Sequence, residues 1–248
     1  NYARRMAESS ESYWERADLV QTVLDALAAA GLDLDRLDVD QLAVTDQFHG
    51  GGKAVTLRLA ELAGLADGAS LASPPRVLDV GGGLGGPARM LATRFGCTVT
   101  ALDLTPSYVE VAQVLTGKVG LADRVQHLVG DALDLPFDDG SFDVVWTQNS
   151  GMNIADKETL YRGFARVLRR GGTLAFQEPM AGEVTPLHFP IMWADDESSS
   201  FLRTPEEMRS LIGGFGFLER AWEIVTETTS LSSTASPPAC ATTSPPPS

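Results

Sequence analysis

Hydrophobic residues gather in short continuous runs along the chain, and segments with helical spacing separate these runs. The apolar runs predict five strands, at residues 76–81, 97–104, 124–132, 141–148 and 173–179. Helical spacing of apolar residues predicts helices at 88–95, 106–120 and 157–172. Strands that alternate with helices imply right-handed crossovers and an α/β fold with a doubly wound, mostly parallel sheet. In such a sheet, ligands bind at the carboxyl ends of the strands.

Two further helices are predicted before the first strand. Apolar residues recur at helical spacing over residues 10–30, and Gly31 ends that helix. An irregular glycine turn, "FHGGG", precedes a second helix whose apolar residues share one face. We therefore expect an N-terminal helical cap over residues 1–70 and the main domain over residues 71–228.

Acidic residues outnumber basic ones, which narrows the classes of partner. Lys and Arg total 19 against 33 Asp and Glu, and the formal net charge is -14. Because this charge repels phosphate backbones and anionic lipid surfaces, we expect neither a nucleic-acid nor a membrane partner. No apolar stretch approaches the roughly 20 residues that span a bilayer, and no signal-peptide pattern opens the sequence, so we expect a cytoplasmic protein. Cys97 and Cys240 indicate neither a disulfide framework nor a metal cluster, and no metal is expected.

A run of glycines follows the first predicted strand. The stretch "VLDVGGGLGGPA" at residues 77–88 places a glycine turn between a buried strand and a helix, where backbone N–H groups can approach a ligand. Gly81, Gly83 and Gly86 fit the pattern G-x-G-x-x-G of dinucleotide sites, and that pattern alone is a weak signal. Other residues must therefore identify the ligand.

Three acidic residues near strand ends narrow that choice. Asp79 lies inside the end of the first strand, where it either supports a cationic ligand group or caps the glycine turn. Asp103 ends the second strand, a position from which a carboxylate accepts hydrogen bonds from ribose hydroxyls. Asp131, with a small residue after it, would flank an adenine ring and disfavours a nicotinamide site.

The segments "VLDVGGGLGG", "VTALDL", "GDALDLPF", "FDVVW" and "RVLRRGGTLAFQEP" together resemble the ordered motifs of class I S-adenosylmethionine-dependent methyltransferases. The resemblance runs from about Arg76 to Pro179 and implies a Rossmann-like methyltransferase fold with S-adenosylmethionine as the cofactor. By this resemblance, the cofactor's methionine part lies against Asp79, Gly81 and Gly83, its ribose near Asp103 and Leu104, its adenine beside Asp131 and Ala132, and Gln148 under the cofactor.

Flanking segments are similar to one branch of that family. "DQFHGGG", "MNIADK", "HFPIMWA" and "SFLRTPEEM" resemble sarcosine and dimethylglycine N-methyltransferases, which implies a small-molecule acceptor, an amine such as a glycine derivative. Because an amine must be neutral when it attacks, His49 is the candidate catalytic base; alternatively, it caps the second helix or pins the N-terminal segment. Asn149 and Asn153, after the fourth strand, and Trp193 are candidate substrate contacts.

The resemblance also implies how the sheet continues. Residues 180–204 are expected to form a lid insertion after the fifth strand, and residues 215–228 can supply a sixth strand. The family's antiparallel seventh strand has no counterpart, so we expect the last strand to be missing. Residues 229–248 carry almost no large apolar side chains, and we expect a disordered tail there because little burial can offset the ordering entropy.

Three other functions stay open. An apolar insertion also suits an O- or C-methyltransferase of specialised metabolism, whereas a truncated relative would bind the cofactor without activity. A dehydrogenase would bind nicotinamide in place of S-adenosylmethionine. The sequence also leaves open whether the protein forms a homodimer.

Overall fold

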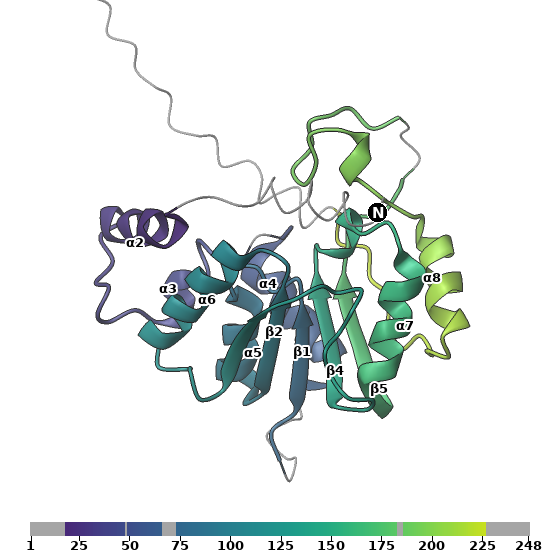
Figure 1. The fold of residues 1–248 in the computed structure, drawn as a ribbon, viewed down its shortest axis with the longest axis horizontal. Coiled ribbons are helices and arrows are strands. Elements are labelled where there is room, and N and C mark those ends of the chain that lie inside the picture. Colours follow the sequence, from purple (N-terminus) through teal and green to yellow (C-terminus); the bar gives the residue numbers. More distant parts are fainter. Residues whose placement is uncertain (1–17, 48, 66–72, 183–185, 227–248) are drawn as a thin grey trace, which may run out of the picture.

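The fold is organised around a parallel β-sheet (Figure 1). The computed structural model describes residues 18–47, 49–65, 73–182 and 186–226. In that part of the chain, five parallel strands lie in the order β3-β2-β1-β4-β5. The strands are β1 (Arg76–Val80), β2 (Thr98–Asp103), β3 (Val125–Val129), β4 (Phe142–Gln148) and β5 (Leu168–Gln177). The strand order reverses between β1 and β4, the point at which doubly wound sheets bind ligands, and the predicted fold class is confirmed.

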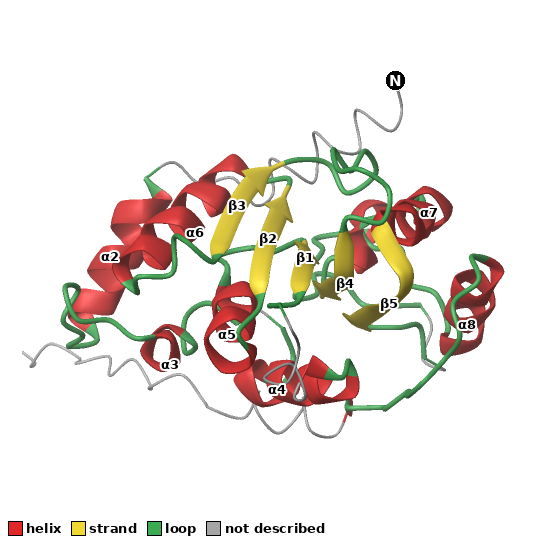
Figure 2. Cartoon of the chain, turned by 90° about the horizontal axis from the view of Figure 1, so that it is seen from below, coloured by secondary structure: helices red, strands yellow, loops and turns green. Residues whose placement is uncertain are grey.

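Helices cover both faces of the sheet (Figure 2). One face packs against α4 (Gly52–Leu62) and α5 (Gly86–Phe95), and the other packs against α7 (Lys157–Val167) and α8 (Pro205–Gly214). At the β3 end lie α6 (Pro106–Lys118), α2 (Leu19–Ala29) and α3 (Val39–Leu42). Two 3-10 turns, η2 (Gly151–Asn153) and η3 (Glu197–Ser199), complete the described elements.

Successive residues of a strand contribute to two separate apolar cores. In β1, Val77 packs with Leu91 of α5 on one face, whereas Leu78 and Val80 pack with Phe164 of α7 on the other. All of these side chains are almost fully buried. A central parallel strand is covered on both faces, which explains why its sequence is a continuous apolar run.

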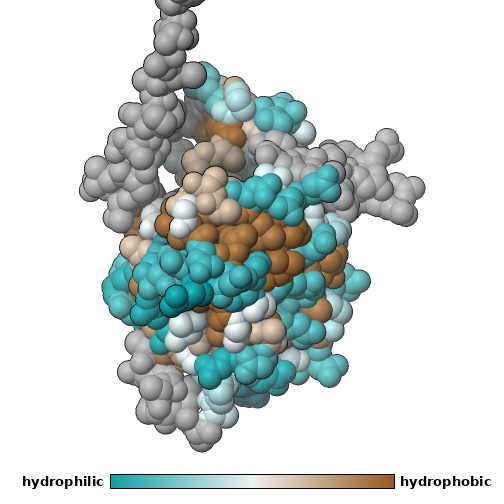
Figure 3. All heavy atoms as spheres, turned by 90° about the vertical axis from the view of Figure 1, so that its left-hand side faces the viewer, coloured by the Kyte–Doolittle hydropathy of each residue, from teal (hydrophilic) through white to brown (hydrophobic). Residues whose placement is uncertain are grey.

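The α2 side of the molecule carries a third apolar cluster. Leu27 of α2 is fully buried against Val111 and Leu115 of α6, and other α2 side chains are half-buried beside them. Figure 3 shows apolar side chains gathered in a band on this side, between polar areas. The helix predicted over residues 10–30 is therefore confirmed over 19–29, while its first part lies outside the described residues.

The boundary between α7 and β5 differs from the prediction. The helix predicted over 157–172 ends at Val167, and β5 begins at Leu168, which pairs with Phe142. The register then shifts, so that Val144 pairs with Thr173. Residues 169–172 read Arg-Arg-Gly-Gly, and glycines are frequent just after a helix, so this local pattern favours a helix end at the glycines. The pairing and burial of Leu168 outweigh that local pattern, since a strand tolerates extra residues as a bulge.

The predicted sixth strand is absent from the described residues 215–226. Three aromatic side chains of this segment, Phe215, Phe217 and Trp222, are instead half-buried without strand pairing. Trp222 packs edge-to-face against Phe176 of β5, with 5.8 Å between ring centroids. The guanidinium of Arg209 lies 4.1 Å from the Trp222 ring centroid. Aromatic contacts thus place this segment beside β5. The predicted tail and the position of a seventh strand lie outside the described residues.

Two findings bear on membrane and metal binding. No helix in the described parts of the chain combines the length and apolar character that crossing a membrane requires. Across the same residues, no group of three or more His, Cys, Asp or Glu side chains is placed to hold a metal ion. Cys97 is a buried free thiol, and burial raises its pKa to about 12; Cys240 lies outside the described residues.

Candidate active site

A large cavity lies over the carboxyl ends of the strands, at the switch between β1 and β4. The predicted site residues that line it are His49, Gly81, Gly83, Asp103, Leu104, Asp131, Ala132, Gln148, Asn149, Asn153 and Trp193. These residues meet there because parallel strands end at the same edge of the sheet. Asp79 does not line the cavity; it lies behind the glycine turn with 2% of its surface exposed.

Backbone hydrogen bonds fix the shape of the glycine turn after β1. The N–H groups of Gly81 and Gly82 donate to the carbonyl oxygen of Leu102, at 2.8 and 3.2 Å. The N–H of Gly83 donates to Oδ2 of Asp103 at 2.8 Å. Both contacts cross from β1 to the end of β2, so the two strand ends build one site.

The glycines of the turn are needed for different reasons. A Cβ on Gly81 would lie 2.3 Å from Cβ of Ser150, and one on Gly86 would lie 2.2 Å from the carbonyl oxygen of Asp46. Both glycines therefore allow close packing within the protein. Gly83 has nothing within 4 Å of its Cβ position and a φ of +53°, so its open side faces free space at the cavity. That open side is where a ligand can approach the backbone.

Asp79 is a buried carboxyl group beneath this turn. Its Oδ2 has no hydrogen-bond partner, and burial together with the nearby charge of Asp103 raises its pKa to about 7. The N–H groups of Gly81, Gly82 and Gly83 donate elsewhere, so none of them is capped by Asp79. Of the two roles predicted for Asp79, these contacts therefore favour support of a cationic ligand group over a cap of the glycine turn. An unpartnered buried acid fits a site for a ligand that carries a positive charge.

Asp103, at the end of β2, can accept further hydrogen bonds. Oδ1 of Asp103 accepts the N–H of Thr105 at 2.9 Å, and Oδ2 accepts that of Gly83. A carboxylate has about four lone-pair positions, and these two backbone donors together with the Thr105 side chain do not occupy all of them, so Asp103 can still accept from a ligand hydroxyl. Burial raises the pKa of Asp103, and the two backbone donors oppose that rise.

The predicted adenine wall follows β3. Asp131 is exposed, and its Oδ1 accepts the N–H of Leu133 at 2.8 Å, which holds the turn after β3 in place. Ala132 and Leu104 lie on the cavity wall and have half-buried, apolar side chains. Two small or apolar side chains beside an exposed carboxylate fit a flat heteroaromatic ring.

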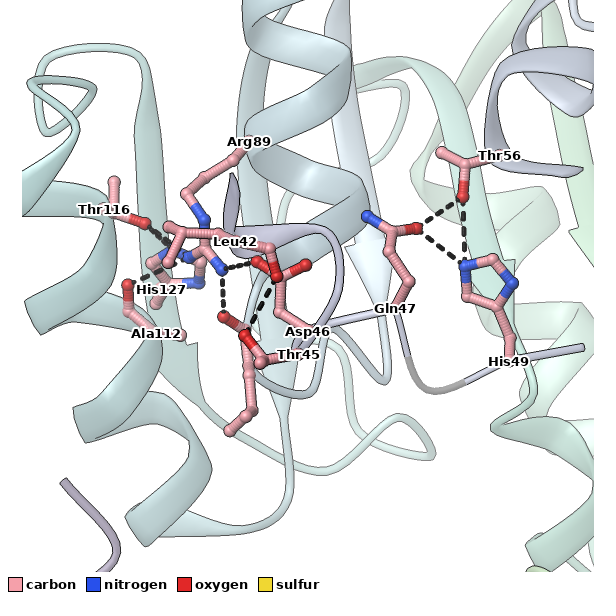
Figure 4. A network of polar contacts seen from close by, with 11 residues as sticks. Leu42, Thr45, Asp46, Gln47, His49, Thr56, Arg89, Ala112, Thr116 and His127 are labelled. Carbon is pink, nitrogen blue, oxygen red and sulfur yellow. Dashed lines mark hydrogen bonds and ion pairs between the residues drawn. The ribbon is translucent and has the colours of Figure 1, made fainter. Parts of the chain in front are cut away.

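His49 belongs to a polar network between the N-terminal segment and the sheet (Figure 4). Its Nε2 lies 2.9 Å from Oε1 of Gln47 and 3.0 Å from the hydroxyl of Thr56. Its Nδ1 lies 3.4 Å from the amide nitrogen of Gln148. A proton on Nε2 suits these contacts, because Gln47 then accepts it and Nδ1 accepts from the Gln148 amide.

Burial decides the charge of His49. His49 is 8% exposed, and burial lowers its pKa to about 4. The carbonyl oxygen of Gly50, 3.5 Å from Nδ1, opposes this shift because it accepts a hydrogen bond from the protonated ring. The imidazole is therefore neutral at pH 7. A neutral ring with both nitrogens in contact ties Gln47 and His49 to Thr56 of α4 and Gln148 of β4, and a base role for His49 stays a prediction.

Gln148 joins that network from the end of β4. Its Oε1 lies 3.1 Å from the Thr56 hydroxyl and accepts the indole N–H of Trp146 at 3.1 Å. Its amide donates to Oε1 of Gln177 at 2.8 Å, and the Gln177 amide donates to the carbonyl of Gly50 at 2.9 Å. The cavity floor here is polar and uncharged.

A second cluster in Figure 4 fixes the same segment from the side of α5. Arg89 is fully buried, and its Nη2 lies 2.6 Å from Oδ2 of Asp46. The guanidinium also donates to the carbonyls of Leu84 and Ala112 and to the hydroxyl of Thr116. Burial lowers the pKa of Arg89 and raises that of Asp46, and their mutual attraction opposes both shifts.

The three predicted substrate contacts differ in what they touch. Asn149 has a φ of +52° and donates its backbone N–H to the carbonyl of Gln177. The side-chain amide of Asn153 donates to the carbonyls of Trp193 and Ser199, at 2.9 and 2.7 Å. The Trp193 indole N–H donates to the Ser200 hydroxyl at 3.1 Å. Asn153 and Trp193 therefore hold the insertion together at the cavity.

Three residues that support the site were not predicted from the sequence: Arg89, Lys157 and Glu178. A signal for Lys157 exists: it lies one turn before Leu160 and two turns before Phe164, on the buried face of α7. A cation on an apolar helix face indicates a buried partner.

Comparisons with known proteins agree with this geometry. The family model described as "Methyltransferase domain" matches residues 78–176. Sarcosine/dimethylglycine N-methyltransferase of Halorhodospira halochloris is 36% identical over 149 residues, which cover 59% of this chain and 53% of the relative. The probable chloroplastic tocopherol O-methyltransferase of Oryza sativa subsp. japonica is 41% identical over 101 residues, 41% of this chain and 28% of the relative.

A solved structure is similar over a longer part of the chain. Phosphoethanolamine N-methyltransferase 2 of Haemonchus contortus, in complex with phosphomonomethylethanolamine and S-adenosylhomocysteine, has a TM-score of 0.63 and 26% sequence identity. The match covers 74% of this chain and 41% of that one. The chain thus spans about half the length, or less, of these relatives. The region that matches the methyltransferase-domain model, residues 78–176, contains most of β1, the glycine turn and Asp103.

Proposed function

We propose that this protein binds S-adenosylmethionine at the carboxyl ends of β1 and β2 and transfers its methyl group to a small-molecule acceptor, an amine such as a glycine derivative. Two observations at the same turn carry the proposal: Oδ2 of the buried Asp79 has no hydrogen-bond partner, and Gly83 is open toward the cavity. This arrangement suits a ligand that brings an ammonium or sulfonium group against a backbone turn. The sulfonium of the cofactor would supply an activated methyl group for in-line attack by an acceptor with a free electron pair: the bond to the acceptor would form as the carbon–sulfur bond breaks, with S-adenosylhomocysteine as the leaving group.

Each predicted cofactor residue has a role in this proposal. Asp79 balances the ligand's positive charge through the turn, and Gly81 and Gly83 let the backbone approach the methionine part. Asp103 accepts the ribose hydroxyls with the lone pairs that its backbone contacts leave free. Leu104, Asp131 and Ala132 line the adenine end, and Gln148 lies under the cofactor as part of the uncharged floor.

On the acceptor side, uncharged side chains of the protein orient the acceptor and exclude water from it. Asn149 lines the cavity, while Asn153 and Trp193 support its wall. His49 is neutral, and the acceptor amine must also be neutral when it attacks, so the ring adds no charge to the acceptor side. Such a site accelerates displacement by orientation, since the charge of the sulfonium is dispersed in the transition state.

Broader assignments complete the proposal. We infer a cytoplasmic enzyme without a nucleic-acid partner, because the net charge of -14 opposes binding to phosphate backbones. A homodimer is the proposed assembly, to be checked by light scattering of the purified protein.

Methyl transfer is tested with a deuterated-methyl cofactor and a panel of acceptors, first glycine derivatives and then phenols. The proposal expects mass-shifted product with an amine and equimolar S-adenosylhomocysteine. Product with phenols alone would replace nitrogen by oxygen as the acceptor atom. Cofactor binding with no product from either class would contradict the enzyme assignment and favour a binding protein.

A further inference from the structure

The turn η2, which follows β4 at the rim of the cavity, is held by charged groups from elsewhere. A helical turn leaves backbone N–H groups free at its start, and the side chain of Ser150 at the N-cap makes no capping bond. Glu178, just after β5, takes that place: its two oxygens accept the N–H groups of Gly151 and Met152, at 2.8 and 3.0 Å.

The other end of the turn receives a cation. Nζ of Lys157, which is 4% exposed, donates to the carbonyls of Gly151 and Ile154. A carboxylate at the start and an ammonium at the end both match the dipole of the turn. Lys157 and Glu178 therefore hold one backbone segment from both sides.

Packing at the turn leaves no room for a side chain at position 151. A Cβ on Gly151 would lie 2.7 Å from Oε1 of Glu178, so only glycine permits the carboxylate to come this close. Burial raises the pKa of Glu178 to about 7, against its backbone donors and Lys157. Burial also lowers the pKa of Lys157 to about 8. Neither charge is exposed enough to serve as a surface ion pair.

The outer side of the turn carries the insertion. The carbonyl of Met152 accepts the N–H of Phe201 at 2.8 Å. Asn153 donates its amide to the carbonyls of Trp193 and Ser199, as described above. Three bonds from two adjacent residues thus attach residues 193–201 to the turn, and both Trp193 and Phe201 line the cavity.

We propose that Glu178 and Lys157 are positioning residues: they fix η2 to the end of β5, and through Met152 and Asn153 they set the position of residues 193–201 at the acceptor side of the cavity. No atom of either charged group needs to touch the acceptor. The effect on acceptor binding rests on the proposed function, whereas the mechanical coupling does not.

Amide hydrogen exchange on the full chain tests the coupling without any ligand. Glu178→Gln keeps the size of the side chain but turns a donor toward an N–H, so about one charged hydrogen bond is lost. The N–H groups of Gly151, Met152 and Phe201 should then exchange at least about tenfold faster. Exchange in β1, at Leu78 and Val80, should not change. Unaltered exchange at Phe201 would overturn the coupling.

Two further variants separate coupling from general damage. Asn153→Ala removes two of the three outer contacts and leaves the bond from Phe201 to Met152. Residues 193–201 should then be held less firmly, so Phe201 should exchange faster while Gly151 and Met152 stay protected. Glu110→Gln, a change on the exposed side of α6, should alter none of these amides. Faster exchange in β1 of Glu178→Gln would indicate general damage to the fold, and the test would then rest on Asn153→Ala. Unchanged exchange at Phe201 in Asn153→Ala would overturn the proposal.

Kinetics then distinguish positioning from chemistry. With an identified acceptor, Glu178→Gln and Asn153→Ala should both raise KM about tenfold with little change in kcat, and S-adenosylhomocysteine affinity should stay within about twofold. A loss of kcat at constant KM in Glu178→Gln would mean that the carboxyl acts on the reacting atoms, and the positioning role would be wrong. Absence of methyl transfer in the wild type would contradict the proposed function and leave the exchange result valid.

Discussion

Oδ2 of Asp103 accepts a hydrogen bond from the backbone N–H of Gly83 at 2.8 Å, across 20 residues of sequence. The end of β2 therefore shapes the turn that follows β1. The open side of Gly83 stays toward the cavity. Beneath the turn, Oδ2 of Asp79 has no hydrogen-bond partner. A ligand in the cavity would therefore meet the open side of Gly83 and the Asp103 carboxylate, while Asp79 would act from behind the turn.

Substitutions in the glycine turn should separate ligand binding from packing. Gly83→Ala meets no atom within 4 Å, so it should cost stability only through its left-handed backbone, about 1–2 kcal/mol, while weakening S-adenosylhomocysteine binding. Gly85→Ala should destabilise more, because its Cβ would lie 2.5 Å from the His127 ring and 2.7 Å from Nη1 of Arg89. Urea denaturation and ligand titration of both variants check this. Equal binding by Gly83→Ala and the wild type would contradict the ligand approach at Gly83.

Removing the buried cation of α5 should be costly. Arg89→Met leaves Asp46 buried without a partner, so we expect a loss of about 3–5 kcal/mol in the free energy of unfolding. Arg94→Met is the matched control, because Arg94 and Asp40 form an ion pair with both side chains nearly half exposed, worth about 0–1 kcal/mol. Denaturant titration measures both. Similar losses in the two variants would show that Arg89 does not hold the segment around Asp46.

Ligand binding should be linked to the protonation of Asp79. The folded-state pKa is raised to about 7, so this carboxyl is largely protonated at pH 6. A cationic ligand favours the ionised form, so binding should release a proton below pH 7 and tighten as pH rises from 5 to 8. Calorimetry in two buffers with different ionisation enthalpies measures the proton release. The variant Asp79→Asn should release none, and proton release that persists in that variant would assign the effect to another group.

The raised pKa of Asp79 also has a consequence for stability. Its pKa is about 3.8 when unfolded and about 7 when folded, so between these values the folded state binds more protons. This contribution to stability is fully present below about pH 3.8 and is lost as pH rises through about 7. Ligand-free Asp79→Asn should therefore lose less stability than the wild type between pH 5 and 7, as measured by urea denaturation. An identical pH dependence in both proteins would contradict the burial of this charge.

His49 should titrate far below neutrality. Its folded pKa of about 4 lies under the ordinary value of 6.5, so the unfolded state binds more protons between these values. The stability from His49 is present above pH 6.5 and is lost as pH falls through 4. NMR titration of the histidine ring protons, assigned by comparison with His49→Gln, should give an inflection near pH 4. An inflection near 6.5 would show that the ring is solvated and available as a base.

The arrangement of the sheet could be predicted because its causes are local. Apolar runs such as 76–80 fit a strand that is covered on both faces, and the alternation with helices determines that the strands are parallel. Parallel strands then bring Asp103, Asp131 and Asn149 to one edge. These steps need only periodicity and handedness.

Side-chain partners from distant segments could not be predicted in this way. Asp46 and Arg89 are 43 residues apart, and the hydrogen bonds of Asn153 reach across 40 and 46 residues. Nothing in local spacing indicates that Asn153 supports the insertion, or that Asp79 lacks a partner. In segment 215–226, by contrast, the local pattern predicted a strand, but the segment packs against β5 through the aromatic ring of Trp222.

Calorimetric titration with S-adenosylhomocysteine tests the central claim most directly. The full chain should bind the ligand saturably, and Asp103→Ala should bind at least about a hundredfold more weakly, because it loses charged hydrogen bonds to the ligand and the support of Gly83. Asp123→Ala, an exposed change before β3, should bind as the wild type does. Absence of binding by a folded wild-type chain, or undiminished binding by a folded Asp103→Ala, would contradict the proposed cofactor site.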